Sequence, residues 1–166
     1  MRPSASWPAW RLDADGAKNT LRYASGLVCG VPLVLFQHFR GNLDSWDPAL
    51  IDALASARRV ITFDNAGVGG STGTTADTIE QMARDAIAFI AALQFGQVDL
   101  LGFSIGSFVA QQIALIRPAM VRRLVLASSA PQGAAGMHGW APEVIGAVGT
   151  PQTSPEAYLK IGRAHV

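Results

Sequence analysis

Short apolar runs alternate with longer amphipathic segments over most of this chain, from about residue 33 to residue 127. Four of the runs are apolar on both faces, as expected of buried strands: 33–36, 60–63, 98–101 and 124–127. The alternation predicts βαβ units, and therefore an α/β fold with a mostly parallel sheet flanked by helices. The last two strands are expected inside the sheet rather than at its edge.

The clearest helix is predicted over residues 78–93, where apolar residues recur at steps of three and four. Asp77 and Glu80 have the spacing of a capping box at the start of this helix. Glu80 is also placed to pair with Arg84 one turn later. One face of the helix is apolar, so its expected role is packing against the sheet.

Composition and charge narrow the classes of function. The 166 residues carry a formal net charge of +1, with acids and bases spread along the chain, which argues against a nucleic acid partner. No apolar run approaches the roughly 20 residues that cross a bilayer, and the first ten residues hold prolines and tryptophans rather than a signal peptide. A small-molecule substrate is the expected partner, with no membrane partner, and the oligomeric state is left open.

The cysteine, histidine and glycine positions bear on location and cofactors. Cys29 is the only cysteine, so the chain can form neither an internal disulfide nor a thiolate cluster, and a cytoplasmic protein is expected. The three histidines are scattered, so no metal site is predicted. The glycine-rich turns lack the lysine and the spacing of phosphate-binding loops, and no cofactor is expected.

The strongest chemical signal is the sequence Gly-Phe-Ser-Ile-Gly at 102–106, directly after a buried strand. The residues that follow predict a helix that begins just after Ser104 and ends before Pro118. A serine on such a strand-to-helix turn is exposed as a nucleophile, and the helix directs its N-terminal N–H groups toward the reaction. Gly102 and Gly106 occupy positions where a side chain would crowd the strained turn.

Two further segments accompany this motif. The sequence Gln-His-Phe-Arg-Gly at 37–41 follows the first strand, with Trp46 five residues after its glycine, and the glycine-rich segment 64–71 follows the second strand. Together with the serine motif and with Pro118 ahead of the last strand, they resemble the α/β-hydrolase fold family in order and spacing. The resemblance covers about residues 33–131.

The resemblance assigns roles to the residues after the first strand. The family's oxyanion loop usually reads His-Gly-x-Pro-Gly, and here Gln37 stands for the histidine, His38 for the glycine and Arg40 for the proline. The resemblance implies that the backbone N–H groups of Phe39 and Ile105 stabilise the oxyanion. His38 is a candidate pocket residue beside them.

The function that this resemblance implies is hydrolysis of small esters or related acyl compounds through a covalent acyl-enzyme on Ser104. Serine at this position argues against haloalkane dehalogenases and epoxide hydrolases, which place an aspartate there. Three alternatives are left open: cofactor-free perhydrolysis of the haloperoxidase type, hydrolysis of a carbon–carbon bond, and a non-catalytic, ligand-binding member of the fold.

The partners of the serine are not found in the expected order. In this family an acid and then a histidine follow the nucleophile. Glu143 and Glu156 are the only acids after Ser104, His138 precedes both, and His165 follows with no strand to carry it. The sequence therefore predicts an N-terminal fragment that lacks the acid and the base and is nearly inactive.

The expected organisation follows from this interpretation. Residues 1–130 form the N-terminal part of the hydrolase core, truncated before the later strands, and 131–160 form the start of a lid with short helices at 140–148 and 155–161. Residues 161–166 are hypothesised to be a non-native tail, because one set of codons that would encode them resembles a common sequencing-adapter sequence. In such a fragment the last predicted strand would be left as an exposed edge.

Overall fold

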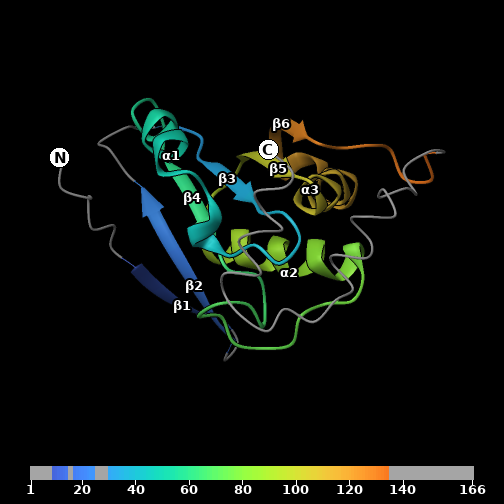
Figure 1. Cartoon of the computed structure of the whole chain (residues 1–166), viewed down its shortest axis with the longest axis horizontal. Coiled ribbons are helices and arrows are strands. Elements are labelled where there is room, and N and C mark those ends of the chain that lie inside the picture. The colour runs from blue at the N-terminus through green and yellow to red at the C-terminus, as the bar shows by residue number, and fades with distance from the viewer. Residues whose placement is uncertain (1–8, 15–16, 25–29, 135–166) are drawn as a thin grey trace, which may run out of the picture. The chain divides into compact units, whose positions relative to one another are not determined.

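The computed structural model describes residues 9–14, 17–24 and 30–134, and within these residues six strands form one sheet (Figure 1). The strand bounds are Ala9–Ala14 for β1, Ala17–Ala24 for β2, Leu33–Phe36 for β3, Val60–Phe63 for β4, Val98–Phe103 for β5 and Val121–Ala127 for β6. Their lateral order is β1-β2-β4-β3-β5-β6. β4, β3, β5 and β6 run parallel, whereas β2 pairs antiparallel with both β1 and β4.

The four parallel strands are the four that the apolar runs predict. β3 and β4 have the predicted bounds, while β5 continues to Phe103 and β6 begins earlier, at Val121. Every residue of β3 and β4 is buried, which explains why these strands are apolar on both faces. The prediction of a mostly parallel sheet in an α/β fold is confirmed.

The hairpin of β1 and β2 is missed by the sequence analysis. Its register runs from the Ala14–Ala17 pair to the Ala9–Arg22 pair, and β2 continues against β4 through Leu21 and Phe63. A signal is present in the sequence, because Asp-Ala-Asp-Gly at 13–16 separates two segments of alternating character, as in many hairpins. The polar content of both segments hides it from a search for buried strands.

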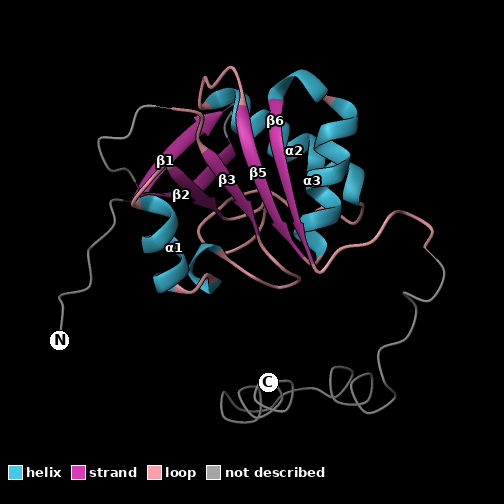
Figure 2. Ribbon diagram, turned by 90° about the horizontal axis from the view of Figure 1, so that it is seen from above, coloured by secondary structure: helices cyan, strands magenta, loops and turns pink. Residues whose placement is uncertain are grey.

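Helices cover both faces of the sheet (Figure 2). α2 (Ile79–Ala92) and α3 (Ile105–Ile116) pack on one face, and α1 (Pro48–Ala55) packs on the other. The larger core lies under α2 and α3 and includes Val34, Phe36, Ile61, Phe89, Ile90, Leu100 and Ile113. α3 therefore lies directly on β3 and β5, and this packing positions the turn between β5 and α3.

α1 is a second element that the sequence analysis misses. The carboxylate of Asp47 accepts a hydrogen bond from Ala49 N at 2.8 Å, and Pro48 occupies the first turn, where its missing N–H costs nothing. This pair is a helix-start signal, but the helix is only eight residues long. Ile51 and Leu54 pack against Leu33, Leu35 and Val60 on the second face of the sheet.

The start of α2 corrects one prediction. Thr78, rather than Asp77, is the N-cap, because its hydroxyl oxygen accepts a hydrogen bond from Gln81 N at 3.2 Å. The predicted capping box of Asp77 and Glu80 is therefore wrong by one residue, since a threonine at the boundary is an equally good cap. The predicted pair is confirmed, with Arg84 Nη2 at 2.6 Å from Glu80 Oε1.

Replacing Thr78 with alanine is expected to lower the free energy of unfolding by about 1 kcal/mol, because one N–H at the start of α2 loses its acceptor. Replacing Asp77 with alanine is the matched control, and it should cost only about 0.3 kcal/mol through the helix dipole. Urea unfolding followed by circular dichroism measures both. A larger loss of unfolding free energy in the Asp77 variant than in the Thr78 variant would mean that Asp77 caps the helix, as the capping-box spacing predicts.

β6 lies at an edge of the sheet, as expected for the last predicted strand of a fragment, and not inside the sheet, as its apolar run predicts. Within the described residues β6 is the last strand of the sheet, paired only with β5. Leu124, Val125 and Leu126 are 36%, 51% and 40% exposed, although the sequence of the strand is apolar. An apolar run predicts a buried strand with neighbours on both sides. Whether the strand is buried depends on which other segments pack against it, and the run itself does not encode this.

The described residues after 129 form a turn in which Ala134 N–H donates to Pro131 O at 3.1 Å. The expected lid helices at 140–148 and 155–161, and the hypothesised tail 161–166, lie outside the described residues. The same holds for Cys29 and the N-terminal residues 1–8. No helix in the described part of the chain has the length and apolar character needed to cross a membrane.

Candidate active site

Ser104 lies on a sharp turn between β5 and α3. Its φ of 55° and ψ of −122° are rare for a residue other than glycine. Ser104 N–H donates to Ala127 O at 3.0 Å, and Ser104 O accepts from Ser107 N at 2.8 Å and from Ser107 Oγ at 2.6 Å. The half-buried Ser104 side chain makes no capping hydrogen bond to the helix. The backbone is thus held in a strained conformation while the hydroxyl is not used to support it.

The two glycines around Ser104 lie where the turn has no room for a side chain. A Cβ at Gly102 would lie 2.4 Å from Gly106 O, and a Cβ at Gly106 would lie 2.2 Å from Phe36 O. These atoms belong to the backbone and cannot move aside as a flexible side chain could. The short distance from Gly106 to Phe36 O means that the start of α3 lies directly against the end of β3. The serine turn and the loop after β3 are therefore neighbours.

That loop, 37–41, contains the first predicted oxyanion donor. Gly41 N–H donates to His38 O at 3.0 Å, and Arg40 has φ 63°. A proline ring fixes φ near −65°, so proline could not adopt the conformation found at Arg40. The loop therefore has a shape that differs from one built on the family's usual proline, and the sequence comparison alone did not predict this.

Phe39 and Ile105 lie next to the carboxyl ends of two neighbouring strands, β3 and β5. Phe39 lies in the loop after β3 and is 58% exposed, while Ile105 is the first residue of α3. The N–H of a first helical residue has no partner within its own helix. Since Phe36 pairs with Gly102, both predicted donors follow the carboxyl ends of neighbouring parallel strands.

His38 is fixed by two contacts. Its Nδ1 lies 2.8 Å from Phe39 O, and its ring packs edge-to-face on the ring of Phe103, with centroids 6.0 Å apart. Phe103 directly precedes Ser104. The candidate pocket residue therefore lies beside the serine turn.

Gln37 is a feature whose importance the sequence analysis missed. Its side chain is buried, and neither the amide oxygen nor the amide nitrogen has a hydrogen-bond partner in the described structure. A buried amide without partners is costly, so such groups are rare in folded proteins. A Cβ at Gly41 would lie 3.1 Å from Gln37 Oε1, so the amide lies under the loop that carries Phe39.

Asp64 joins the loops after β3 and β4. Its Oδ1 accepts from Leu43 N at 2.8 Å and its Oδ2 accepts from Gly70 N at 3.0 Å, while its backbone oxygen accepts from Ser71 Oγ at 2.9 Å. The side chain is buried, so these hydrogen bonds balance its burial. An acid directly after a buried strand was the available signal, and its positioning role was missed.

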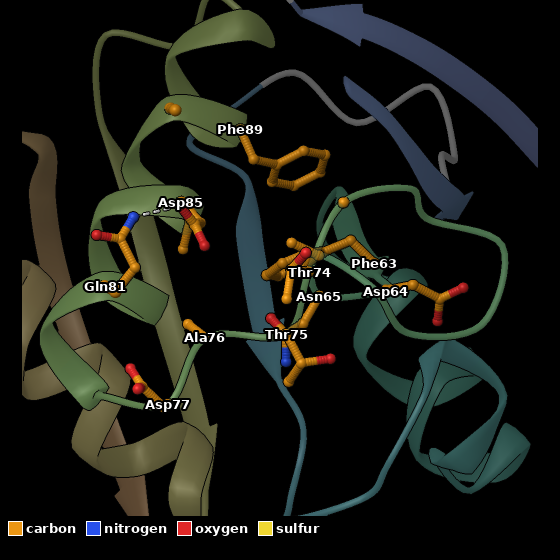
Figure 3. Close-up of a pocket in the computed structure, with 14 residues that line it drawn as sticks. Phe63, Asp64, Asn65, Thr74, Thr75, Ala76, Asp77, Gln81, Asp85 and Phe89 are labelled. Atoms are coloured by element: carbon orange, nitrogen blue, oxygen red, sulfur yellow. Dashed lines mark hydrogen bonds between the residues drawn. The ribbon is translucent and has the colours of Figure 1, made fainter. Parts of the chain in front are cut away.

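A cavity of about 650 Å³ opens between α2 and the loop after β4 (Figure 3). Phe63 and Phe89, stacked with centroids 4.5 Å apart, lie at its apolar end, and Gln81 donates to Asp85 on its polar side at 2.8 Å. Its lining includes neither Ser104 nor the residues of the loop 37–41. The cavity is therefore separate from the serine turn and the loop 37–41, where the predicted catalytic residues lie.

The described residues contain no group of three or more histidine, cysteine, aspartate or glutamate side chains that could hold a metal ion. The histidines and acids that follow Ser104 in the sequence, His138, His165, Glu143 and Glu156, lie outside the described residues. The structure thus brings the turn that carries Ser104 and Ile105 beside the loop that carries His38 and Phe39.

Comparisons with known proteins agree with this arrangement. A family model described as alpha/beta hydrolase fold matches residues 3–165. The poly(3-hydroxyalkanoate) depolymerase of Ectopseudomonas oleovorans is 37% identical over 100 residues, which cover 60% of this chain and 35% of the relative. A Mycobacterium tuberculosis protein with the provisional name non-heme bromoperoxidase is 34% identical over 98 residues, covering 58% of this chain and 37% of the relative.

A solved structure, an alpha/beta hydrolase fold protein from Chitinophaga pinensis, superposes with a TM-score of 0.82 at 38% identity and covers 93% of this chain and 55% of its own. This chain therefore spans little more than half of that structure and about a third of the two curated relatives. The family match extends over almost all of the chain and includes the serine turn. The chain belongs to the α/β-hydrolase fold family.

Proposed function

We propose that Ser104 is the nucleophile of a serine hydrolase that acts on small esters or related acyl compounds. The observation that carries the proposal is the strained backbone of Ser104 on a turn from which both neighbouring glycines exclude side chains. Strain is retained at a site where the surrounding structure enforces it, and such positions are concentrated at functional sites. The relative named as a depolymerase, whose named substrate is a polyester, supports an acyl substrate.

The proposed chemistry begins with attack of Ser104 Oγ on the acyl carbon, which turns the carbonyl oxygen into an oxyanion. The N–H groups of Phe39 and Ile105 would donate hydrogen bonds to that oxygen, and the N-terminal end of α3 would add its positive dipole. The alcohol then leaves, and water hydrolyses the acyl-serine. Because this chain spans only part of its relatives, the substrates and full activity of the whole protein form part of the proposal.

Reaction with a fluorophosphonate probe tests this proposal. The probe is expected to phosphonylate the chain once, on the peptide that contains Ser104, with release of fluoride. The Ser104→Ala variant should take up no label, whereas Ser56→Ala, which removes a serine hydroxyl at the end of α1, should be labelled at the parent rate. Mass spectrometry after proteolysis locates the adduct. Label on the parent chain that persists at the same rate in Ser104→Ala would refute the assignment.

A second candidate function is perhydrolysis, in which hydrogen peroxide replaces water or alcohol as the acyl acceptor. The relative that is provisionally named a non-heme bromoperoxidase favours it. The same serine and oxyanion donors would serve both reactions. Formation of peracetic acid from acetate and peroxide, dependent on Ser104 and faster than ester hydrolysis, would favour this alternative.

A further inference from the structure

The cavity between α2 and the loop after β4 has the size of a ligand site and no part in the proposed reaction. Its volume of about 650 Å³ lies within the range of roughly 300–1,000 Å³ that is usual for small-molecule sites. One wall is a single face of α2, on which Gln81, Asp85 and Phe89 follow one another at steps of four residues. The opposite wall is the loop that carries Thr74 and Thr75, and Asp85 faces these threonines across the cavity (Figure 3).

The loop wall is held in place by its own backbone. Gly67 N–H donates to Thr72 O at 3.1 Å, and a Cβ at Gly67, which has φ 72°, would lie 2.7 Å from Thr75 N. Asp64, at the start of the loop, accepts hydrogen bonds from two backbone N–H groups at 2.8 Å and 3.0 Å. Because these contacts lie within the loop and at its base, the wall does not need a ligand to shape it, and the cavity is preformed.

The charges around the cavity are negative. Among the described residues that line it, the ionisable ones are Asp64, Asp77 and Asp85, and none is a lysine, an arginine or a histidine. Both carboxylate oxygens of Asp64 already accept backbone N–H groups. Asp85 receives one hydrogen bond, from Gln81 Nε2 at 2.8 Å, which leaves its second oxygen available. The exposed Asp77 adds a second available carboxylate, so a cation is attracted to the cavity and an anion is repelled.

A primary ammonium group matches this lining, because it carries three N–H donors and no acceptor. The carboxylates of Asp77 and Asp85 can accept from it, and so can the threonine hydroxyls of the loop wall. The stacked rings of Phe63 and Phe89 lie at the apolar end of the cavity and offer a surface for an aromatic ring. We propose that the cavity is a binding site for small primary amines that carry an aromatic ring, separate from the serine turn.

Three indole compounds of similar size and different charge test this proposal: tryptamine, a primary ammonium at neutral pH, tryptophol, which is neutral, and indole-3-acetate, an anion. Each is titrated into the nitrogen-15-labelled full chain while the backbone amide signals are followed by NMR. Tryptamine is expected to bind with a dissociation constant on the order of 1 mM. The largest shifts should fall on the amides of Thr74, Thr75, Gln81 and Asp85. Tryptophol should bind about 10-fold more weakly, and indole-3-acetate should not bind.

Variants on α2 locate the site. Asp85→Asn keeps an acceptor for Gln81 but loses the charge, and it should weaken tryptamine binding about 10-fold while leaving tryptophol unaffected. Glu80→Gln is the matched control, because it removes a carboxylate of the same helix that does not line the cavity. Ala88→Phe places a ring in the cavity and should prevent binding. Ala91→Phe, at an exposed position outside the lining, should not.

Ser104→Ala should bind tryptamine as the parent chain does, because Ser104 does not line the cavity. Loss of binding in that variant, indole-3-acetate that binds as tightly as tryptamine, or unchanged tryptamine affinity in Asp85→Asn would each overturn the proposal. So would the absence of shifts at about 10 mM tryptamine, tenfold above the expected dissociation constant. Parent-like amide spectra of Asp85→Asn and Glu80→Gln show that both are folded. None of these outcomes bears on the proposed nucleophile, which fluorophosphonate labelling tests separately.

Discussion

Replacing Gly106 with alanine is expected to lower the free energy of unfolding by about 3 kcal/mol, at the upper end of the usual cost of overpacking. The added Cβ would lie 2.2 Å from Phe36 O and 2.6 Å from Gln37 O. Both are backbone atoms at the end of a buried strand, so relief requires α3 to move away from β3. That movement would also separate Ile105 from Phe39, and labelling of Ser104 should fall together with stability.

The matched control is Gly96→Ala, because a Cβ at Gly96 would meet no atom within 4 Å. Its effect on the free energy of unfolding is expected to stay within about 0.5 kcal/mol. Urea titration at neutral pH, followed by tryptophan fluorescence and circular dichroism, measures both variants. A loss below about 1 kcal/mol for Gly106→Ala would mean that α3 is less tightly seated on β3 than the backbone contacts indicate.

The serine turn could be predicted because everything that specifies it is local. Two glycines at fixed spacing, a buried strand before them and an apolar helix after them suffice to place Ser104 at a strained junction. The parallel strands could be predicted for a similar reason, since burial on both faces leaves a continuous apolar run. The N-terminal hairpin has a local turn signal, but polar residues in both of its strands hide it, and its place beside β4 depends on residues about forty positions apart.

The conformation of the residues around Ser104 was harder to predict from the sequence than the serine turn itself. Comparison with the family motif predicts an oxyanion donor at Phe39 in the loop after β3, but the left-handed backbone at Arg40 and the buried, unpartnered amide of Gln37 depend on how that loop closes. The contact of His38 with Phe103 joins two loops that follow different strands. Such contacts arise from topology, and no spacing within one segment encodes them.

At the opposite end of β5, Asp99 forms a buried ion-pair cluster. Its carboxylate accepts from Arg122 Nε at 2.9 Å and Nη2 at 2.8 Å, and from Arg58 Nη1 at 3.1 Å, while its own side chain is only 3% exposed. The register explains how Arg122 reaches it. Val98 pairs with Val121 but Asp99 pairs with Arg123, so Arg122 is the extra residue of a bulge that directs its side chain.

Replacing Asp99 with asparagine is expected to lower the free energy of unfolding by about 3 kcal/mol, because two guanidinium groups lose the charge that balances them. The figure lies at the low end for a broken buried pair, since Arg58 and Arg122 keep about a third of their side-chain surface in water. Glu80→Gln, which breaks the exposed pair with Arg84, is the matched control and should cost about 0.5 kcal/mol or less. Equal losses of unfolding free energy in Asp99→Asn and Glu80→Gln would contradict the expectation that the buried ion pair stabilises the fold more than the exposed one.

The effect of Asp99 should also depend on pH in a defined direction. The hydrogen bonds from Arg122 lower the pKa of Asp99 below its ordinary value of 3.8, and they outweigh burial, which raises it. A depressed folded-state pKa stabilises the fold above the unfolded-state value and loses that effect as pH falls through the folded-state value. The gap in unfolding free energy between the parent and Asp99→Asn should therefore be constant above about pH 5 and shrink below about pH 4. Urea titrations at a series of pH values measure this gap, and a gap that widens on acidification would mean that the arginines do not hold the carboxylate in its charged form.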